Sequence, residues 1–414
     1  MRRKFGPFIL LLLVSMKLFA DEGVGLVVMN PSTSKPEPYY FGIGWGEKGN
    51  LYSQYTGMSA YGDNLGCPSE SGFGSCHSKL SWLGATVVDW QPYIFVQDEQ
   101  GKVWVAQRSG LDSKTWTWKD AGCPFLTPYN CGNIRGLGAT SVRDRLNEPQ
   151  RPYLFVTNDD GKVYNLWRDK NEVWHWSYMK CPGGECGKEL KGLGAISVFD
   201  ASSPSERPYL FAIDDNTSKV WNLWWDTKDA TWHWSDMGCP RNNHDKELCG
   251  KKYHGLGNMM TSALVRTTLE DGIDIGKTRH PYVFLEEADN PGGVYFLRVL
   301  YEKDDKQIGK WWSTTLEGAT QVLGVVPALE YDDIIPVIVS LKKDKRLTTT
   351  YLSMKSADQF YFRDHDCSSC VLNSLVPISR THIPNKRTGA IISGVIIYGY
   401  FGQKKTEFKT YYFW

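Results

Sequence analysis

The residues of this sequence with the clearest chemistry are ten cysteines, which fall into five closely spaced pairs. The pairs are Cys67 and Cys76, Cys123 and Cys131, Cys181 and Cys186, Cys239 and Cys249, and Cys367 and Cys370. An even number of cysteines in a secreted chain favours disulfide bonds, although many connectivities are formally possible. Five local pairs are the most economical choice, because each then closes a loop inside its own repeat. For Cys367 and Cys370 the alternative is a free or metal-binding motif, but zinc would need a second pair at a suitable spacing and the sequence offers none nearby.

Aromatic side chains with nearby aspartates form a second set of residues that could bind a ligand. Aromatic residues make up 14% of the chain and include 17 tryptophans, so they must be buried in a core or used on a binding face. Sugars offer apolar C–H faces and rims of hydroxyl groups, and their sites pair an aromatic platform with hydrogen-bonding side chains. The candidate ligand-binding residues are Trp104, Trp118, Tyr164, Asp169, Trp176, Trp221, Asp226 and Trp234. The competing interpretation of each aromatic is packing between repeats.

The acidic residues do not have the pattern of a catalytic centre. A propeller hydrolase needs two carboxylates that converge once, set for general acid and base work. Here Asp98, Asp159 and Asp214 recur with the repeat, which suits turns. The sequence has no intact S-x-D-x-G-x-T-W box, no Gly-x-Ser-x-Gly and no His-Glu-x-x-His. We therefore predict that the protein is not an enzyme and uses no cofactor and no metal ion; a propeller-type hydrolase is the least favoured alternative.

The sequence contains internal repeats. Residues 136–181 realign on residues 192–239, and a weaker copy covers residues 83–123. The hydrophobic residue that closes a Pro-Tyr-x-Phe element recurs seven times, at intervals of 54 to 73 residues. Its positions are Phe41, Phe95, Phe155, Phe211, Phe284, Val339 and Ile397, of which the last two are inferred from spacing and apolar pattern alone. Such periods are typical of propellers and other repeat architectures.

Each well-kept repeat contains four short runs rich in β-branched and aromatic residues, separated by Gly, Asp, Asn and Pro. Asp160-Gly161, between the second and third runs, suits a tight hairpin. Four antiparallel strands per repeat make a propeller blade, and both faces of such a blade are apolar because its neighbours cover them. In four repeats the first cysteine follows the aromatic residue of the fourth run by five positions. The sequence therefore predicts an all-β propeller of about seven four-stranded blades with local disulfides inside the blades.

The chain is predicted to divide into a leader and one propeller domain. Residues 1–20 combine basic residues, a short apolar run and Ala20 at the end, which predicts a secretory signal peptide and a secreted, extracellular protein. Residues 21–414 form the propeller, with approximate blades at 21–80, 81–135, 136–191, 192–254, 255–323, 324–374 and 375–414. The last repeat has about three strands; residues near 21–30 could supply its fourth strand or could begin the first blade. No later apolar run is long enough to span a membrane.

The charge balance argues against a nucleic-acid partner. The chain has 47 Lys and Arg against 46 Asp and Glu, and four of the basic residues lie in the predicted leader. Binding to a polyanion needs clustered Lys and Arg, which a nearly neutral mature chain does not provide.

The repeat resembles a known family. The stretches WNLWWDTKDATWHWSDMGCP and YNLWRDKNEVWHWSYMKCP are similar to the tandem unit of the seven-bladed β-propeller lectins found in insect-associated bacteria. The match is clearest in residues 81–240; this sequence departs from it by placing Cys before the Pro and by adding a second Cys. The resemblance implies a propeller that binds fucosylated or methylated sugars in pockets between adjacent blades, whereas the loss of intact motifs in nearly half the blades argues against a full ring of equivalent sites.

Two functions follow from these observations. The first is a secreted carbohydrate-binding protein with aromatic platforms between or at the edge of blades, whose partners are glycans. The alternative is a secreted protein-binding or structural scaffold whose partner is an extracellular protein; the divergent later repeats and the insertion at 267–280 favour it. Asn216-Thr217-Ser218 is an acceptor sequon at a hairpin tip, which makes Asn216 a candidate glycosylation site in a eukaryotic host.

Overall fold

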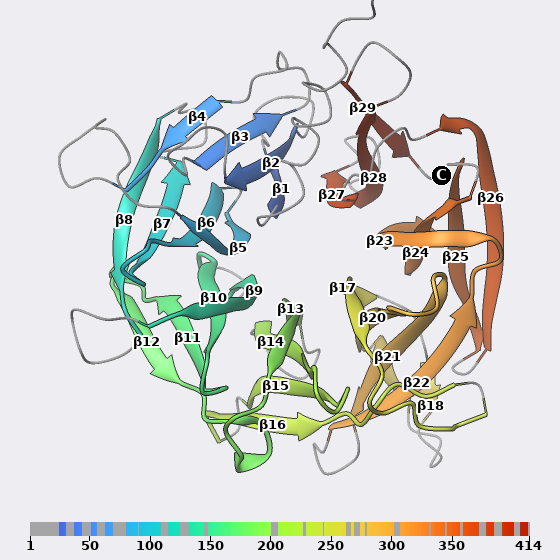
Figure 1. Ribbon diagram of the computed structural model, residues 1–414, viewed down its shortest axis with the longest axis horizontal. Coiled ribbons are helices and arrows are strands. Elements are labelled where there is room, and N and C mark those ends of the chain that lie inside the picture. Colours follow the sequence, from blue (N-terminus) through green and yellow to red (C-terminus); the bar gives the residue numbers. More distant parts are fainter. Residues whose placement is uncertain are drawn as a thin grey trace, which may run out of the picture.

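Strands form where the repeat places its β-branched and aromatic runs, and a computed structural model of the chain arranges them as a ring of antiparallel sheets (Figure 1). The structure describes residues 25–29, 37–43, 51–55, 63–68, 80–89, 91–108, 115–124, 132–144, 148–199, 206–226, 229–242, 244–261, 266–268, 274–277, 280–301, 307–330, 333–343, 346–356, 359–371, 378–384, 391–400 and 406–412.

Seven sheets, numbered here in chain order, contain the strands of the ring in these residues. The first three sheets are β1 (Gly25–Met29), β2 (Glu37–Ile43), β3 (Leu51–Tyr55) and β4 (Asp63–Gly66); β5 (Ser81–Val88), β6 (Gln91–Gln97), β7 (Val103–Arg108) and β8 (Trp116–Gly122); and β9 (Ile134–Val142), β10 (Arg151–Asn158), β11 (Val163–Arg168) and β12 (Trp174–Tyr178). The fourth and fifth are β13 (Leu190–Phe199), β14 (Glu206–Asp214), β15 (Val220–Asp226) and β16 (Thr231–Asp236); and β17 (Tyr253–Thr261), β20 (His280–Glu287), β21 (Gly293–Tyr301) and β22 (Gln307–Thr315). The last two are β23 (Ala319–Glu330), β24 (Asp333–Lys342), β25 (Arg346–Ser356) and β26 (Gln359–Val371); and β27 (Ile378–Pro384), β28 (Ile391–Tyr400) and β29 (Thr406–Tyr412).

The sheets are the blades of a β-propeller, as the sequence predicted. In each sheet the strands pair in chain order, with the first strand nearest the centre of the ring and the last outermost (Figure 1). β1 is the first strand of the first sheet and the seventh sheet has three described strands, which answers the question of how residues near 21–30 are used. The insertion at 267–280 contributes to a separate pair, β18 (Arg266–Thr268) with β19 (Asp274–Lys277).

The described part of the chain contains one helical turn, the three-residue η1 (Pro182–Gly184). None of its helices is long and apolar enough to cross a membrane. The predicted leader, residues 1–20, lies outside the described residues.

The first strands of neighbouring sheets approach each other so closely that the repeated Gly-Leu-Gly element is required. A Cβ atom added to Gly136 would lie 1.9 Å from the carbonyl oxygen of Leu83, and one added to Gly192 would lie 2.1 Å from that of Leu137. Side chains would therefore force the sheets apart near the centre of the ring. The wider spaces between the second, third and fourth strands are filled by apolar clusters that each draw on two adjacent sheets.

A row of tryptophans joins the outer strands of the second to fifth sheets, each to the sheet before it. In each case the indole Nε1–H donates to a backbone carbonyl near the end of the preceding outer strand, at 2.8 to 3.1 Å. The pairs are Trp118 with Leu65, Trp176 with Ala121, Trp234 with Met179 and Trp311 with Met237. We call these four residues the linking tryptophans. The four acceptors lie two residues before Cys67, Cys123, Cys181 and Cys239, respectively.

The disulfides close the connections that follow the outer strands. Cys181–Cys186 and Cys239–Cys249 are bonded within single repeats, which confirms the local pairing predicted for them. Cys67 and Cys123 are also disulfide-bonded, and their predicted partners, Cys76 and Cys131, lie outside the described residues. The side chains of Cys367 and Cys370 lie outside them as well, so the pairing of these two stays a prediction.

A phenylalanine in place of a linking tryptophan should weaken the ring measurably. Trp176→Phe keeps an aromatic ring but removes the donor to the Ala121 carbonyl, and a buried acceptor left without its partner costs about 1–3 kcal/mol. Trp174→Phe is a matched control two residues away, because the indole nitrogen of Trp174 is buried without a hydrogen-bond partner. Urea unfolding should therefore show a larger loss of stability for Trp176→Phe; equal losses would contradict the linking role.

Peptide mapping without reduction should recover the local disulfides. We expect linked peptides for Cys181 with Cys186 and for Cys239 with Cys249, and the repeat predicts the same local pairing for the other three pairs. The same digest after reduction identifies the partners by mass. A bond between cysteines of two different repeats would be inconsistent with this register.

Candidate functional site

A cavity of about 410 Å³ opens between the third and fourth sheets. This volume is within the usual range for small-molecule sites, roughly 300–1,000 Å³. The third sheet contributes Val142, Asp144, Arg151, Tyr153, Asn165, Trp167 and Ser177, and the fourth contributes Glu206, Pro208, Trp225 and Trp232. The cavity therefore combines four aromatic rings with a guanidinium and two carboxylates.

Strand register brings the third-sheet residues to one face. Tyr153 on β10 pairs with Trp167 on β11, which pairs with His175 on β12. The three rings stack across the strands, with centroids 6.5 Å apart for Tyr153 and Trp167 and 4.7 Å apart for Trp167 and His175. Because side chains alternate between the faces of a strand, Arg151, two residues before Tyr153, lies on this face as well.

The fourth-sheet wall is a pair of tryptophans that face each other on adjacent strands. Trp225 on β15 pairs with Trp232 on β16, and their ring centroids are 5.4 Å apart in an edge-to-face arrangement. Trp232 also makes an edge-to-face contact with Phe155 of the third sheet, at 5.7 Å. This contact across the interface fixes one ring of the wall, while Trp225 lines the cavity beside it.

The charged side chains of the cavity are each fixed by an ion pair or a hydrogen bond. Arg151 forms an ion pair with Asp144, and its guanidinium lies 5.4 Å from the centre of the Trp167 ring. Glu206 bridges the two sheets, because its Oε2 accepts the backbone N–H of Arg143 at 2.8 Å and its own N–H donates to the Arg143 carbonyl at 2.8 Å. These contacts position the guanidinium of Arg151 and the carboxylates of Asp144 and Glu206 around the aromatic rings of the cavity.

Tyr153 supplies a hydroxyl that stays protonated. Burial raises the pKa of Tyr153 to about 12, although the charge of Arg151 opposes the shift. The raised pKa means that the folded protein binds this proton more tightly than the unfolded chain does, so the associated stability is lost only as pH rises above about 10. At physiological pH the group can donate a hydrogen bond.

Two predicted site residues, Asp169 and Asp226, belong to the hairpins beside this cavity. Asp169 Oδ2 lies 3.0 Å from His175 Nε2, and this contact and the backbone N–H of Val173 lower the pKa of the aspartate. Asp226 ends β15 next to Trp225. With Asp229 and His233 it forms a group whose ligand atoms lie within 4.8 Å of one another and could reach a metal ion.

The three predicted aromatics of the third strands lie at the opposite edge of the ring. The indole of Trp104 donates to Asp98 at 2.8 Å, and Tyr164 packs against Tyr178 at 5.4 Å. Trp221 is buried beneath the disulfide loop of the third sheet, where a Cβ on Gly183 would lie 2.9 Å from its ring. None of the three lines the cavity described above.

The predicted aromatics of the outer strands, Trp118, Trp176 and Trp234, are linking tryptophans. Their indole N–H groups are used by the preceding sheet, and their rings pack against apolar clusters between sheets. The cavity instead uses Trp232, two residues before Trp234, with Trp225, Trp167, Tyr153 and Arg151. Strand register identifies these cavity residues, because it shows which side chains lie on the face that meets the neighbouring sheet.

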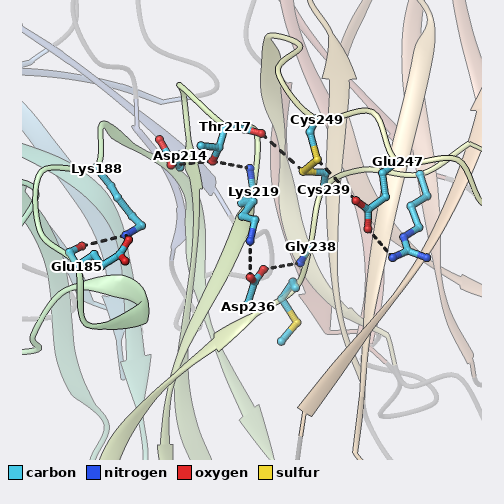
Figure 2. A network of polar contacts seen from close by, with 12 residues as sticks. Glu185, Lys188, Asp214, Thr217, Lys219, Asp236, Gly238, Cys239, Glu247 and Cys249 are labelled. Atoms are coloured by element: carbon cyan, nitrogen blue, oxygen red, sulfur yellow. Dashed lines mark hydrogen bonds and ion pairs between the residues drawn. A yellow bond between two sulfur atoms is a disulfide. The ribbon is translucent and has the colours of Figure 1, made fainter.

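The edge of the ring that carries the disulfides is stiffened by polar contacts (Figure 2). Lys219 Nζ lies 2.9 Å from Asp236, which also accepts the backbone N–H of Gly238 at 2.8 Å. Thr217 donates to Asp214 at 2.7 Å. Asn216 is exposed in the same turn. Because β15 runs from this turn to the hairpin beside the cavity, Asn216 and the cavity lie at opposite edges of the fourth sheet.

Comparisons with known proteins give the fold. No protein-family model and no curated protein match the sequence. Among solved structures, the BP39L lectin from Burkholderia pseudomallei is similar, with 12% identity, 91% of this chain and 92% of that chain covered, and a TM-score of 0.52. AofleA from Arthrobotrys oligospora has 11% identity, coverage of 84% and 93%, and a TM-score of 0.46. The Aleuria aurantia lectin, a six-bladed β-propeller that recognises fucose, has 10% identity, coverage of 78% and 88%, and a TM-score of 0.38. At such identities the likeness concerns the fold.

Proposed function

We propose that this protein is a secreted carbohydrate-binding propeller and that it holds a sugar in the cavity between the third and fourth sheets. The observation that carries the proposal is the composition of the cavity: aromatic rings face a guanidinium and two carboxylates across about 410 Å³. Trp225 and Trp232 can receive the C–H face of a pyranose, while Arg151, Asp144 and Glu206 can bond its hydroxyls. The fold of the BP39L lectin is consistent with this role.

The charges in the cavity favour a neutral sugar. Arg151 is already paired with Asp144, and Glu206 adds a second carboxylate at the same interface. A sialic acid or uronic acid would bring its own carboxylate next to these two, and repulsion between like charges would oppose binding. Fucosylated or methylated glycans, which the sequence resemblance implies, carry no such charge.

Binding without hydrolysis fits the same contacts. A glycosidase needs one carboxylic acid that can donate a proton to the leaving oxygen. In this cavity Asp144 accepts from Arg151 and Glu206 accepts a backbone N–H. Both groups therefore serve as acceptors, which suits recognition of hydroxyl groups.

An extracellular protein is the second candidate partner. The observation that favours it is the β18–β19 hairpin, which interrupts the fifth sheet between β17 and β20 and has no counterpart in the other described sheets. A surface element present once suits a single protein contact better than a repeated sugar site.

Substitutions in the cavity should weaken sugar binding without unfolding the protein. Arg151→Gln removes a charged donor, and loss of a hydrogen bond to a charged group corresponds to about 10- to 100-fold in affinity. Trp225→Ala removes an aromatic wall and should cost up to about 10-fold. A glycan array on residues 21–414 identifies the sugar, and calorimetry with free sugar, starting with methyl α-L-fucoside, measures the affinity.

The matched control is Arg135→Gln, an exposed arginine paired with Glu189 rather than with the cavity, and its affinity should equal that of the wild type. If the Arg151→Gln and Trp225→Ala variants both still bind the array sugar with unchanged affinity, the sugar site must lie outside this cavity. A folded wild-type chain that binds no glycan would favour the protein partner, which a pull-down with the β18–β19 hairpin deleted would then test.

Secretion from a eukaryotic cell should add an N-glycan at Asn216. The side chain is exposed in a turn, and its position at the edge opposite the cavity leaves the sugar site open. Treatment with peptide N-glycosidase F should lower the mass of the wild type and leave Asn216→Gln unchanged. Asn171→Gln, an exposed asparagine outside any sequon, should behave as the wild type; a mass shift in Asn216→Gln would place the glycan at another residue.

A further inference from the structure

The interfaces on either side of the cavity can be compared with it position by position. The third-strand residue that pairs with the tyrosine of the Pro-Tyr element is Gln107, Trp167 and Trp224 in the second, third and fourth sheets. The residue after it is Arg108, Arg168 and Trp225, and this residue pairs with Trp116, Trp174 and Trp232 of the outer strand. Arg168 therefore holds, between the second and third sheets, the position that Trp225 holds in the cavity.

The guanidinium of Arg168 lies across that interface. Its Cζ is 5.1 Å from the ring centre of Tyr93 in the second sheet and 6.0 Å from that of Trp174 in the third. Tyr93 corresponds to Tyr153, and Trp174 corresponds to Trp232. The cation therefore lies between the two rings that would form the walls of an equivalent cavity, in a favourable cation–π arrangement.

An exposed carboxylate lies beside the guanidinium of Arg168. Glu172 Oε1 lies 4.0 Å from Arg168 Nη1. Its Oε2 lies 3.5 Å from Nζ of Lys119, which belongs to the second sheet. The arginine is 13% exposed, so little of its guanidinium reaches solvent. Glu172 thus connects both sheets on the outside of the interface.

The polar groups of the cavity are also replaced at this interface. By strand register, Gln91 occupies the position equivalent to Arg151, Lys119 the position equivalent to Ser177, and Gln150 the position equivalent to Glu206. Gln150 keeps the bridging role of Glu206, because it bonds Asp89 through both its backbone and its side chain. The bridge between sheets is retained, whereas the guanidinium at the position of Arg151 is not.

The interface between the fourth and fifth sheets is closed in another way. Register places Val299 and Gly309 where the cavity has Trp225 and Trp232. Trp224, which corresponds to Trp167, is 6% exposed and packs with Val299 in the same apolar cluster. This interface is filled by core packing.

We propose that Arg168 is a plug that closes the interface between the second and third sheets to sugars, so that this stretch of the ring has one binding cavity, the one beside Trp225. The inference rests on the proposed sugar-binding function and sets its valency. Arg108, the corresponding residue of the second sheet, is 8% exposed and extends the same substitution to the interface with the first sheet. Replacing the plug with a small residue should expose a hollow between Tyr93 and Trp174.

The test follows individual tryptophans by ¹⁹F NMR in the full secreted chain labelled with 5-fluorotryptophan. Trp174→Phe and Trp232→Phe assign the two resonances. With methyl α-L-fucoside, or the best sugar from the array, as the probe, the Trp232 signal should shift saturably and the Trp174 signal should not move. In Arg168→Ala both signals should shift, Trp174 at a weaker affinity. Glu172→Gln, which loosens the plug without removing it, is the second variant if Arg168→Ala does not fold, and it should produce a smaller shift.

The outcomes separate this inference from the function on which it rests. A saturable shift of Trp174 in the wild type would show that the interface is already open and would overturn the plug. A silent Trp174 in both folded variants, with Trp232 still responding, would overturn it too, because closure would then not depend on Arg168. A wild type in which no tryptophan responds to any array sugar would overturn the proposed function and the inference with it.

Discussion

The structure depends on how closely each sheet approaches the one before it. Near the centre of the ring the backbones are in contact at Gly136 and Gly192, where a single methyl group would not fit. At the periphery the linking tryptophans reach back to the preceding outer strand. The third and fourth sheets are thus each attached to the sheet before them at both the inner and the outer strand, and the two attachments fix the angle between neighbours. A space between sheets can then arise only where the side chains in the middle do not fill it.

The cavity is such a space, and small changes decide whether an interface has one. Between the third and fourth sheets, Trp232 makes an edge-to-face contact with Phe155, and a cavity is present beside Trp225. Between the fourth and fifth sheets, Val299 and Trp224 pack together. The same backbone therefore supports either a cavity or a solid core, because the attachments at the inner and outer strands do not depend on the residues between them.

Much of the fold could be predicted from the sequence, because repetition shows four strands and one cysteine connection per unit without any contact being known. The residues that line the cavity could not, because alternation along a strand separates two faces but does not say which of them meets a neighbouring sheet and which meets a cavity. Trp174 and Trp176 share a face, and only the structure shows that one donates to Ala121 and the other does not. In the fifth sheet the sequence offers two adjacent tryptophans, Trp311 and Trp312, and only the structure shows that Trp311, which pairs with Leu297, makes the link.

The two edges of the fourth sheet differ in chemistry, with the cavity at one and the stapled turn of Asn216 at the other. A propeller bound to a glycan-coated surface through Trp225 and Arg151 would face that surface with the edge that carries the cavity. Its disulfide loops would then face outward into the medium. A fluorophore, a fused domain or an immobilisation tag attached near Asn216 would stand about one strand length, roughly 20 Å, from the anchored face. The propeller would thus act as an oriented spacer: the edge with the disulfide loops could be modified without changing the edge that binds the glycan.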